Sequence, residues 1–126
     1  MPRTKITMVA GKSAEYKQKI FSSIYDAMRE AFNVPENDIF MSIDEHPLEN
    51  ICYGKNYLNI KRTNELLMIE ISANDTRSIE QKKALYAAIV KNLVQNIQIR
   101  SEDIFIGLIE VKKENWSFGN GVAQYA

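Results

Sequence analysis

The chain has 126 residues, of which 45% are hydrophobic and 25% charged, as is usual for one soluble globular domain with a moderate core. Sixteen basic residues balance sixteen acidic ones, which argues against a broad surface for nucleic acid or anionic lipid. Cys52 is the only cysteine, which excludes an internal disulfide and favours a cytoplasmic location, and no apolar stretch is long enough for a signal sequence or a membrane span.

The chain contains an internal repeat with a spacing of 65 residues. Residues 12–45 align with residues 77–110 without a gap. A repeat of this size predicts a fold made of two similar units. Positions that agree are expected to serve the shared architecture, whereas positions that differ can be specialised in one copy. The matches include Lys12-Ser13 with Arg77-Ser78, Asp38-Ile39-Phe40 with Asp103-Ile104-Phe105, and Glu45 with Glu110.

The first unit, residues 2–45, is predicted to form a strand, a helix and a second strand. Residues 5–9 suit a short strand, and Ser13 is a suitable N-cap for a helix that runs to about Phe32. After a turn, residues 39–44 suit the second strand. The helix has apolar residues at helical spacing that predict its buried side, namely Ile20, Ile24, Ala27 and Ala31.

The second unit, residues 66–111, repeats this order. Residues 66–72 suit a strand, and residues 104–111 suit the closing strand. Between them, Ser78 and Gln81 have the spacing of a capping box at a helix start. Three apolar residues of this helix are predicted to point inward: Leu85, Ile89 and Leu93.

Each strand–helix–strand unit is short enough to be a parallel βαβ unit with a right-handed crossover. Two such units predict a single α/β (α+β) domain over residues 1–126, with one four-stranded sheet and both helices on one face. The opposite face is then bare. Because the strands are apolar enough to need cover there, we expect an oligomer.

Two segments lie outside the repeat. The connector, residues 46–65, is too long for a simple turn and has room for a short strand pair of its own. The tail, residues 112–126, contains Asn120-Gly121, a strong hairpin signal. Such a hairpin would fold Trp116 and Phe118 back onto the domain.

Several of these features resemble the tautomerase superfamily. Residues 11–17 and 76–82 are both similar to the Gly-Arg-Ser-x-Glu-Gln-Lys segment of that family, and residues 116–119 match a Trp-Ser-Phe-Gly ending. Together with Pro2 and the repeat, they resemble the 4-oxalocrotonate tautomerase-like proteins with two fused units, a subfamily that includes malonate semialdehyde decarboxylases. The resemblance implies a tautomerase/MIF-like fold, a homotrimer, no cofactor, and catalysis by an N-terminal proline that becomes free when Met1 is removed.

Pro2 is the expected general base of such an enzyme. A free N-terminal proline is a secondary amine, and an apolar pocket lowers its pKa from about 8 because burial disfavours the charged form. A base that is neutral near physiological pH can take a proton next to a carbonyl and return it elsewhere. While Met1 is attached, the nitrogen of Pro2 is a tertiary amide and cannot act as a base. The repeat supports specialisation, because the counterpart of Pro2 is Leu67, an ordinary strand residue.

Arg77 is the strongest candidate for binding a carboxylate, or for stabilising a developing enolate. It precedes a predicted helix start, where backbone amides and a guanidinium can share an anion. Its counterpart Lys12 is basic but cannot form a bidentate fork. The decarboxylase pattern has a second arginine where this chain has Asp75, which would weaken the binding of a dianionic or small 3-oxo acid. Arg62 is a further candidate for the carboxylate.

Asp38 matches the aspartate that orients or activates water in the decarboxylases. Asp103 occupies the same place in the copy that has no proline, so Asp38 could equally cap the preceding turn. Trp116 and Phe118 could form an apolar wall that tunes Pro2, or they could pack at a subunit interface. Both roles are compatible.

These residues predict a cofactor-independent, tautomerase-like enzyme for a small keto, enol or unsaturated carboxylic acid. A second hypothesis is decarboxylation or hydration of a 3-oxo or unsaturated acid, in which a cationic Pro2 acts as the acid. A third is a non-catalytic trimeric binding protein whose N-terminus stays blocked. Since His46 is the only histidine and no cysteine cluster accompanies it, no metal site is predicted.

Overall fold

Residues 2–126 are the part of the chain that the computed structural model describes. The long elements follow the predicted order, and the predicted strand bounds differ from the observed ones by at most two residues. The elements are β1 (Arg3–Val9), α1 (Ala14–Phe32), β2 (Met41–His46), β3 (Leu67–Asn74), α2 (Ile79–Ile97) and β4 (Ile104–Val111).

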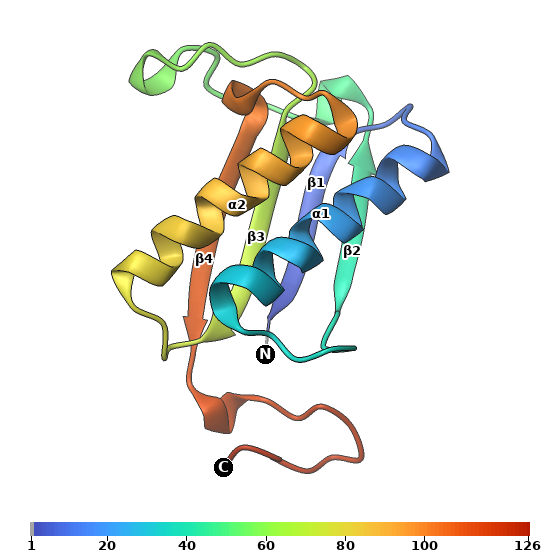
Figure 1. Cartoon of the computed structure of the whole chain (residues 1–126). Coiled ribbons are helices and arrows are strands. Elements are labelled where there is room, and N and C mark those ends of the chain that lie inside the picture. Colours follow the sequence, from blue (N-terminus) through green and yellow to red (C-terminus); the bar gives the residue numbers. More distant parts are fainter. Residues whose placement is uncertain (1) are drawn as a thin grey trace.

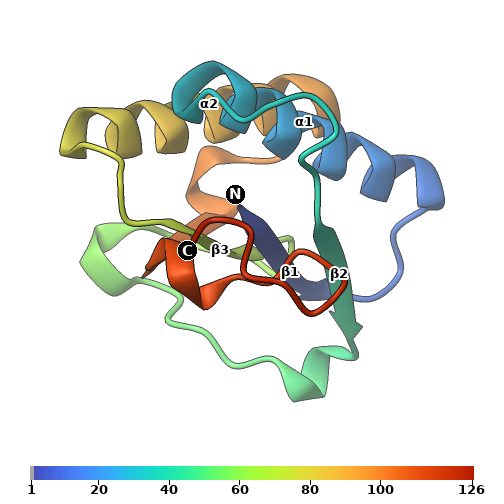
Figure 2. The ribbon, with the colours of Figure 1, turned by 90° about the horizontal axis from the view of Figure 1, so that it is seen from below.

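The four strands form one mixed sheet in the order β2-β1-β3-β4. β1 pairs in parallel with β2, and β3 pairs in parallel with β4, as each βαβ unit requires. β1 and β3 join the two units and run antiparallel, with Arg3 opposite Ser72 and Thr7 opposite Met68. Both helices cover the same face of this sheet (Figures 1 and 2). The predicted fold class and the position of the helices are therefore confirmed.

The two helices begin and end in the same way. The Ser13 hydroxyl accepts a hydrogen bond from the Tyr16 backbone N–H at 3.1 Å, as expected of an N-cap. At the start of α2 the predicted capping box of Ser78 and Gln81 is present, with both hydrogen bonds formed. Each helix ends at a residue in the left-handed conformation, and these two residues are Asn33 (φ 53°) and Gln98 (φ 54°).

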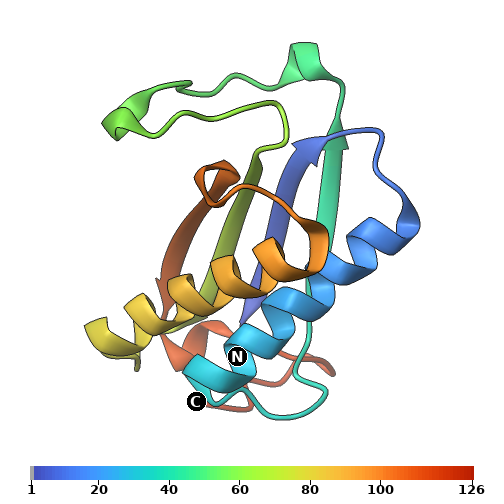
Figure 3. The ribbon, with the colours of Figure 1, turned by 45° about the horizontal axis from the view of Figure 1, so that its top comes forward.

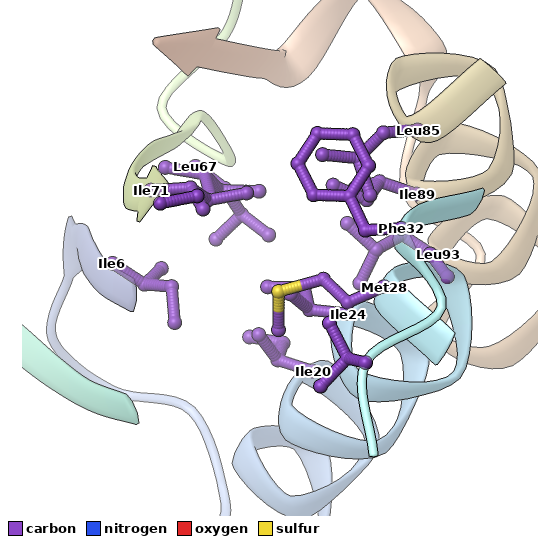
Figure 4. Close-up of a cluster of buried hydrophobic side chains, with 14 of the residues drawn as sticks. Ile6, Ile20, Ile24, Met28, Phe32, Leu67, Ile71, Leu85, Ile89 and Leu93 are labelled. Atoms are coloured by element: carbon purple, nitrogen blue, oxygen red, sulfur yellow. The ribbon is translucent and has the colours of Figure 1, made fainter. Parts of the chain in front are cut away.

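The hydrophobic core lies between the helices and the sheet (Figure 4). The predicted inward residues of α2 are fully buried, and so are those of α1 except Ala31, which is only partly buried. Met28 and Phe32 extend the buried side of α1 toward its C-terminal end. The sheet contributes mainly β-branched and leucine side chains, namely Ile6, Leu67, Ile69 and Ile71.

The helices leave the opposite face of the sheet open (Figure 2). This face is less apolar than expected, because β1 directs its apolar side chains to the helices and presents Lys5 and Thr7 here. Apolar character is concentrated on β3 and β4, where Met68 lines the face and Phe105 and Ile109 are 52% and 46% exposed.

The connector between β2 and β3 does not contain the short strand pair for which it has room. It extends from one end of the sheet (Figure 3) and has two short 3₁₀ helices, Leu48–Asn50 and Tyr57–Asn59. Arg62 explains this outcome. Its Nη1 donates hydrogen bonds of 3.1–3.2 Å to three backbone carbonyls of the connector, and these belong to Gly54, Tyr57 and Ile60. Those carbonyls therefore face a guanidinium and not a neighbouring strand.

The tail forms the predicted turn but not the predicted β-hairpin. Asn120 (φ 60°) and Gly121 (φ 68°) both adopt the left-handed conformation that Asn-Gly favours. The flanking residues do not pair as strands, because the Gln124 side chain takes up the backbone groups there. It accepts from the Phe118 N–H at 3.0 Å and donates to the Gly119 carbonyl at 3.0 Å.

No helix among residues 2–126 combines the length and the apolar character that a membrane crossing would need.

The repeat leads to a prediction about stability. Ile24 and its counterpart Ile89 are both fully buried, so Ile24→Ala and Ile89→Ala should each lower the free energy of unfolding by about 2–5 kcal/mol. Urea unfolding at one fixed protein concentration measures this. Val94→Ala, at a position that is 40% exposed, serves as the control and should cost less than about 1 kcal/mol. An isoleucine variant that behaved like this control would contradict the packing described here.

Candidate active site

A cavity of about 440 Å³ lies at the end of the sheet where β1 begins and β3 ends. The N- and C-terminal ends of the described chain both lie at this end (Figures 1 and 3). The cavity is bordered by the end of α1, the start of α2, the approach to β2 and the tail. Its lining residues are Phe32, Pro35, Asp38, Asn74, Thr76, Arg77, Gln81, Lys113 and Tyr125.

Asp38 lines this cavity with one carboxyl oxygen that has no hydrogen-bond partner among residues 2–126. Its Oδ1 is buried and accepts no hydrogen bond from residues 2–126. Burial raises the pKa of the Asp38 carboxyl above its ordinary value of 3.8, and the positive charge of Arg77 partly offsets that increase. Unpaired buried carboxyl oxygens are costly to stability, so they are uncommon where stability alone is selected. The arrangement makes Asp38 a candidate site residue.

Arg77 lines the same cavity from the residue before the N-cap of α2. One of its Nη atoms donates to the Phe32 carbonyl at 3.1 Å, and the guanidinium lies 4.7 Å from the centre of the Phe32 ring. These contacts hold the group at the C-terminal end of α1, where a cation is favourable. A guanidinium has five N–H donors, so most of its capacity remains for an anion in the cavity. Burial lowers the pKa of Arg77, and Asp38 raises it.

Pro2 is buried at the same end of the sheet, although it does not itself line the cavity. Arg3 lies opposite Ser72, and the Thr4 N–H donates to the Phe40 carbonyl at 2.9 Å. Pro2, which precedes Arg3, therefore lies between the end of β3, which carries Asn74, and the approach to β2, which carries Asp38. Met1 lies outside the described residues. The expectation that Pro2 becomes the free N-terminus therefore stays a prediction.

The aromatic residues of the tail lie beside this cavity. The Trp116 indole N–H donates to Oδ1 of Asn74, a lining residue, at 2.8 Å. Phe118 stacks on Trp116 with ring centres 5.7 Å apart and meets the Tyr125 ring at 4.9 Å. Trp116 and Phe118 therefore lie next to two lining residues, Asn74 and Tyr125, and their expected role as an apolar wall for Pro2 stays a prediction.

The second copy uses the counterpart of Asp38 differently. Asp103 is fully buried, and its two oxygens accept hydrogen bonds of 2.7 Å from the N–H and the hydroxyl of Thr63. Arg100 also lies 3.7 Å from it. The first copy lacks the counterpart of Arg100, because Pro35 takes that position there. Among residues 2–126, Asp103 is therefore paired and Oδ1 of Asp38 is not.

The counterpart of Arg77 is also neutralised internally. Lys12 forms an ion pair with Glu65 at 2.6 Å and lies 5.1 Å from the centre of the Tyr16 ring. Leu67 stands there in place of Pro2, so the equivalent end of the second unit lacks the expected proline. Only the first unit can therefore provide the expected site.

Two residues considered from the sequence do not reach the cavity. Nη1 of Arg62 donates to the connector carbonyls, and Arg62 does not line the cavity, so its expected contact with the substrate stays a prediction. Asp75 is exposed and does not line the cavity, so its charge is not opposed to Arg77 inside it. No group of three or more histidine, cysteine or acidic side chains in residues 2–126 is placed to hold a metal ion.

Several lining residues were not anticipated as site residues. Comparing the copies could have shown two of them, because Asn74 replaces Val9 and Gln81 replaces Tyr16 at matching positions. Lys113 lies beyond the repeated window and has no such signal.

Comparison with known proteins agrees with this fold. Two family models, both described as tautomerase enzyme, match residues 2–59 and 38–119. "Probable tautomerase YusQ" of Bacillus subtilis (strain 168) is 40% identical over 124 residues, which cover 98% of each chain. The chain belongs to the tautomerase family.

Solved structures show that it is a member with two fused units. A malonate semialdehyde decarboxylase aligns with a TM-score of 0.92 and 24% identity, over 98% of this chain and 95% of that one. FG41 malonate semialdehyde decarboxylase inhibited by 3-bromopropiolate aligns with a TM-score of 0.91 and 29% identity, over 98% and 93%. R7 fused 4-OT, an asymmetric trimer, aligns with a TM-score of 0.79 and 18% identity, over 96% and 95%.

The two aspartates should respond oppositely to substitution. Because burial raises the pKa of Asp38, its ionised form destabilises the fold at neutral pH, and Asp38→Asn should raise Tm by about 1–3 °C. Asp103→Asn should lower Tm by roughly 5 °C or more, since it disrupts two buried hydrogen bonds.

The gain from Asp38→Asn should also depend on pH. In the wild type, the destabilisation by ionised Asp38 is complete above the folded-state pKa and absent below the unfolded-state pKa of about 3.8. The rise in Tm caused by Asp38→Asn should therefore shrink as the pH is lowered from 7 toward 4. Thermal unfolding followed by circular dichroism across this range measures it. A lower Tm for Asp38→Asn at pH 7 would show that Asp38, like Asp103, serves the scaffold.

Proposed function

We propose that this protein is a cofactor-independent tautomerase that acts on a small keto or enol carboxylic acid, with Pro2 as its general base. The observation that carries the proposal is the unsatisfied carboxyl of Asp38 in a cavity shared with Arg77, at the end of the sheet where Pro2 lies. This arrangement supports proton transfer beside a bound carboxylate.

In the proposed reaction, Arg77 binds the substrate carboxylate through the donors that Phe32 does not use. The neutral nitrogen of Pro2 removes a proton from the carbon next to the carbonyl, and the C–H electron pair forms the enolate double bond. The same proton is then returned to the enolate oxygen or to a conjugated carbon, which completes the isomerisation. Arg77 is also placed to stabilise the negative charge that develops on oxygen.

Asp38 and the tail would assist this step in different ways. Asp38, whose pKa is raised by burial, lines the cavity beside Arg77 and would act there as an acid or as a group that orients water. Trp116 and Phe118 would keep water and charge away from Pro2, which favours its neutral form. Their stacking and the bond from Trp116 to Asn74 hold this wall in place.

Decarboxylation or hydration of a 3-oxo or unsaturated acid is a second candidate. It is supported by the similarity to malonate semialdehyde decarboxylases, and the structure with the TM-score of 0.92 is described in terms of decarboxylase and hydratase activities. Asp75, which argued against this chemistry, is exposed and outside the cavity. In this case Pro2 would be cationic and would act as the acid, and Asp38 would position water.

Both candidates require Met1 to be removed. If it is retained, the remaining possibility is a non-catalytic trimeric binding protein with a blocked N-terminus. The intact mass of protein purified from its native host distinguishes these cases, because retention of Met1 would exclude both enzymatic proposals.

Pro2→Ala tests the catalytic role. Ketonisation of the enol form of phenylpyruvate or of 2-hydroxymuconate by protein without Met1 should slow by about 10²–10⁴-fold in this variant, since the general base is lost. Lys12→Gln, which alters the neutralised counterpart of Arg77, is the control and should keep the wild-type rate. Equal rates for the wild type and Pro2→Ala would mean that Pro2 is not the catalyst.

The pH profile of the wild-type enzyme separates the two enzymatic candidates. Base catalysis needs neutral Pro2, so kcat/KM for ketonisation should rise with pH through the pKa of that amine. Acid catalysis by cationic Pro2 would give a rate of decarboxylation or hydration that falls through the same range.

We also propose that the chain forms a homotrimer through the open face of the sheet. The R7 fused 4-OT of the same fold is a trimer, and Met68, Phe105 and Ile109 supply exposed apolar surface on this face. Sedimentation equilibrium should give three times the chain mass of 14.5 kDa. Phe105→Glu should lower that mass, and a monomeric wild type would contradict the proposal.

A further inference from the structure

Asn74 brings a buried amide group to the candidate cavity. It is the last residue of β3, is only 8% exposed and lines the cavity. Its backbone is held by the edge strand β4. Asn74 pairs with Val111 in the register of the sheet, and the next residue, Asp75, donates from its N–H to the Val111 carbonyl at 3.1 Å. The position of this amide at the cavity is therefore set by the sheet.

The hydrogen bond from Trp116 fixes the orientation of the amide. An indole N–H is a donor only, so the atom that it meets at 2.8 Å must be the amide oxygen, Oδ1 of Asn74. The amino group Nδ2 is then the part of the amide that remains for another partner, and it donates to no acceptor among residues 2–126. Leaving buried donors unused lowers stability. The two N–H donors of Nδ2 are available to an acceptor in the cavity.

The repeat indicates that the shared architecture does not require this amide. The counterpart of Asn74 is Val9, which ends β1 as Asn74 ends β3 and has no side-chain donor. The antiparallel junction places Ser72 opposite Arg3. Because Asn74 lies two residues beyond Ser72, it is carried to the side of the chain start, where Pro2 lies. The amide donors are therefore found only beside the proposed base.

We propose that Asn74 is a catalytic residue, whose Nδ2 donates a hydrogen bond to the carbonyl oxygen of the substrate and to the enolate oxygen formed from it. This inference rests on the proposed function for the identity of the site and adds the group that recognises the carbonyl. When Pro2 takes the proton from carbon, the C–H electron pair forms the new C=C bond and the carbonyl π pair moves to oxygen. The amide protons stay on nitrogen. Their hydrogen bond strengthens as the oxygen becomes negative, which lowers the barrier.

Two substitutions separate this role from the anchoring of the tail. Asn74→Asp keeps an oxygen for the Trp116 N–H but has no donor, and Asn74→Val, which installs the residue of the counterpart position, removes both. Each should lower kcat for ketonisation of the enol form of phenylpyruvate by about 10²–10³-fold, with a much smaller change in KM. The comparison is made on the high-pH plateau, where Pro2 is neutral in every variant.

Two controls accompany them. Trp116→Phe removes only the anchoring hydrogen bond and should lower kcat by less than about tenfold. Asn115→Asp makes the same exchange at an exposed position that does not line the cavity, so it should keep the wild-type kcat. Circular dichroism checks that each variant is folded.

A binding experiment tests the same contact without turnover. Benzoylformate and phenylacetate share the ring and the carboxylate, and the first has a carbonyl where the second has a CH₂ group. Benzoylformate has no C–H beside its carbonyl, so it cannot enolise. In isothermal titration calorimetry the wild type should bind benzoylformate about three- to tenfold more tightly. Asn74→Val should remove this preference and change the affinity for phenylacetate less than about twofold, whereas Arg77→Gln should weaken both probes.

The role of Asn74 is wrong if Asn74→Asp keeps the wild-type kcat, if Trp116→Phe lowers kcat as much as Asn74→Val does, or if the wild type binds the two probes equally. A preference for benzoylformate that depends on Asn74, in a protein whose Pro2→Ala variant retains full activity, would refute the proposed base and leave the carbonyl contact intact. Loss of activity in Pro2→Ala without any preference for benzoylformate would refute only the role of Asn74.

Discussion

The antiparallel pairing of β1 with β3 is the constraint on which the rest of the structure depends. Within each unit the two strands are parallel and the helix crosses one face, so the units alone would not bring their ends together. The antiparallel junction places the start of β1 beside the end of β3. As a result, the first residues of the chain lie at the same end of the sheet as the start of α2, and the cavity forms there.

The same pairing creates a related location at the opposite end of the sheet, where the start of β3 lies beside the end of β1. The repeat supplies similar residue types there, but each polar group is satisfied internally. Asp103 is bonded to Thr63, and Lys12 is paired with Glu65. At the candidate site, Asp38 lacks such a partner among the described residues. A nearly symmetric scaffold thus carries an asymmetric distribution of unsatisfied polar groups, which is typical of a functional site that lowers stability.

The tail contributes to the site because it is anchored by side chains. The hydrogen bond from Trp116 to Asn74 and the stacking of Phe118 hold the segment next to the cavity. Gln124 then takes the place of a paired strand around the Asn-Gly turn. These side-chain interactions place Lys113 and Tyr125 at the cavity without a regular hairpin.

Local rules of sequence explain why the helices and strands were predictable and why the connector and tail were not. Helix starts depend on residues three positions apart, as in Ser78 and Gln81, and strands depend on short apolar runs. The conformation of the connector depends instead on the guanidinium of Arg62, which donates to carbonyls up to eight residues away. The sequence did not indicate which carbonyls Arg62 would bind. The position of Asp75 two residues before Arg77 in the sequence also did not show that Asp75 would lie outside the cavity.

The sequence by itself determined the two-unit architecture, the helix caps, the core of the helices and two residues that line the candidate cavity, Asp38 and Arg77. It could do so because the repeat makes the two copies controls for each other, and because caps and apolar periodicity are short-range properties. Only the tertiary structure decided which of the two aspartates is satisfied and which cation is neutralised. It also decided that Asn74 and Lys113 join the site. These outcomes depend on contacts between residues far apart in the sequence. Asp103 meets Thr63 and Trp116 meets Asn74 at the two ends of the parallel β3–β4 pair, and Lys12 meets Glu65 where the antiparallel junction places the end of β1 beside the start of β3.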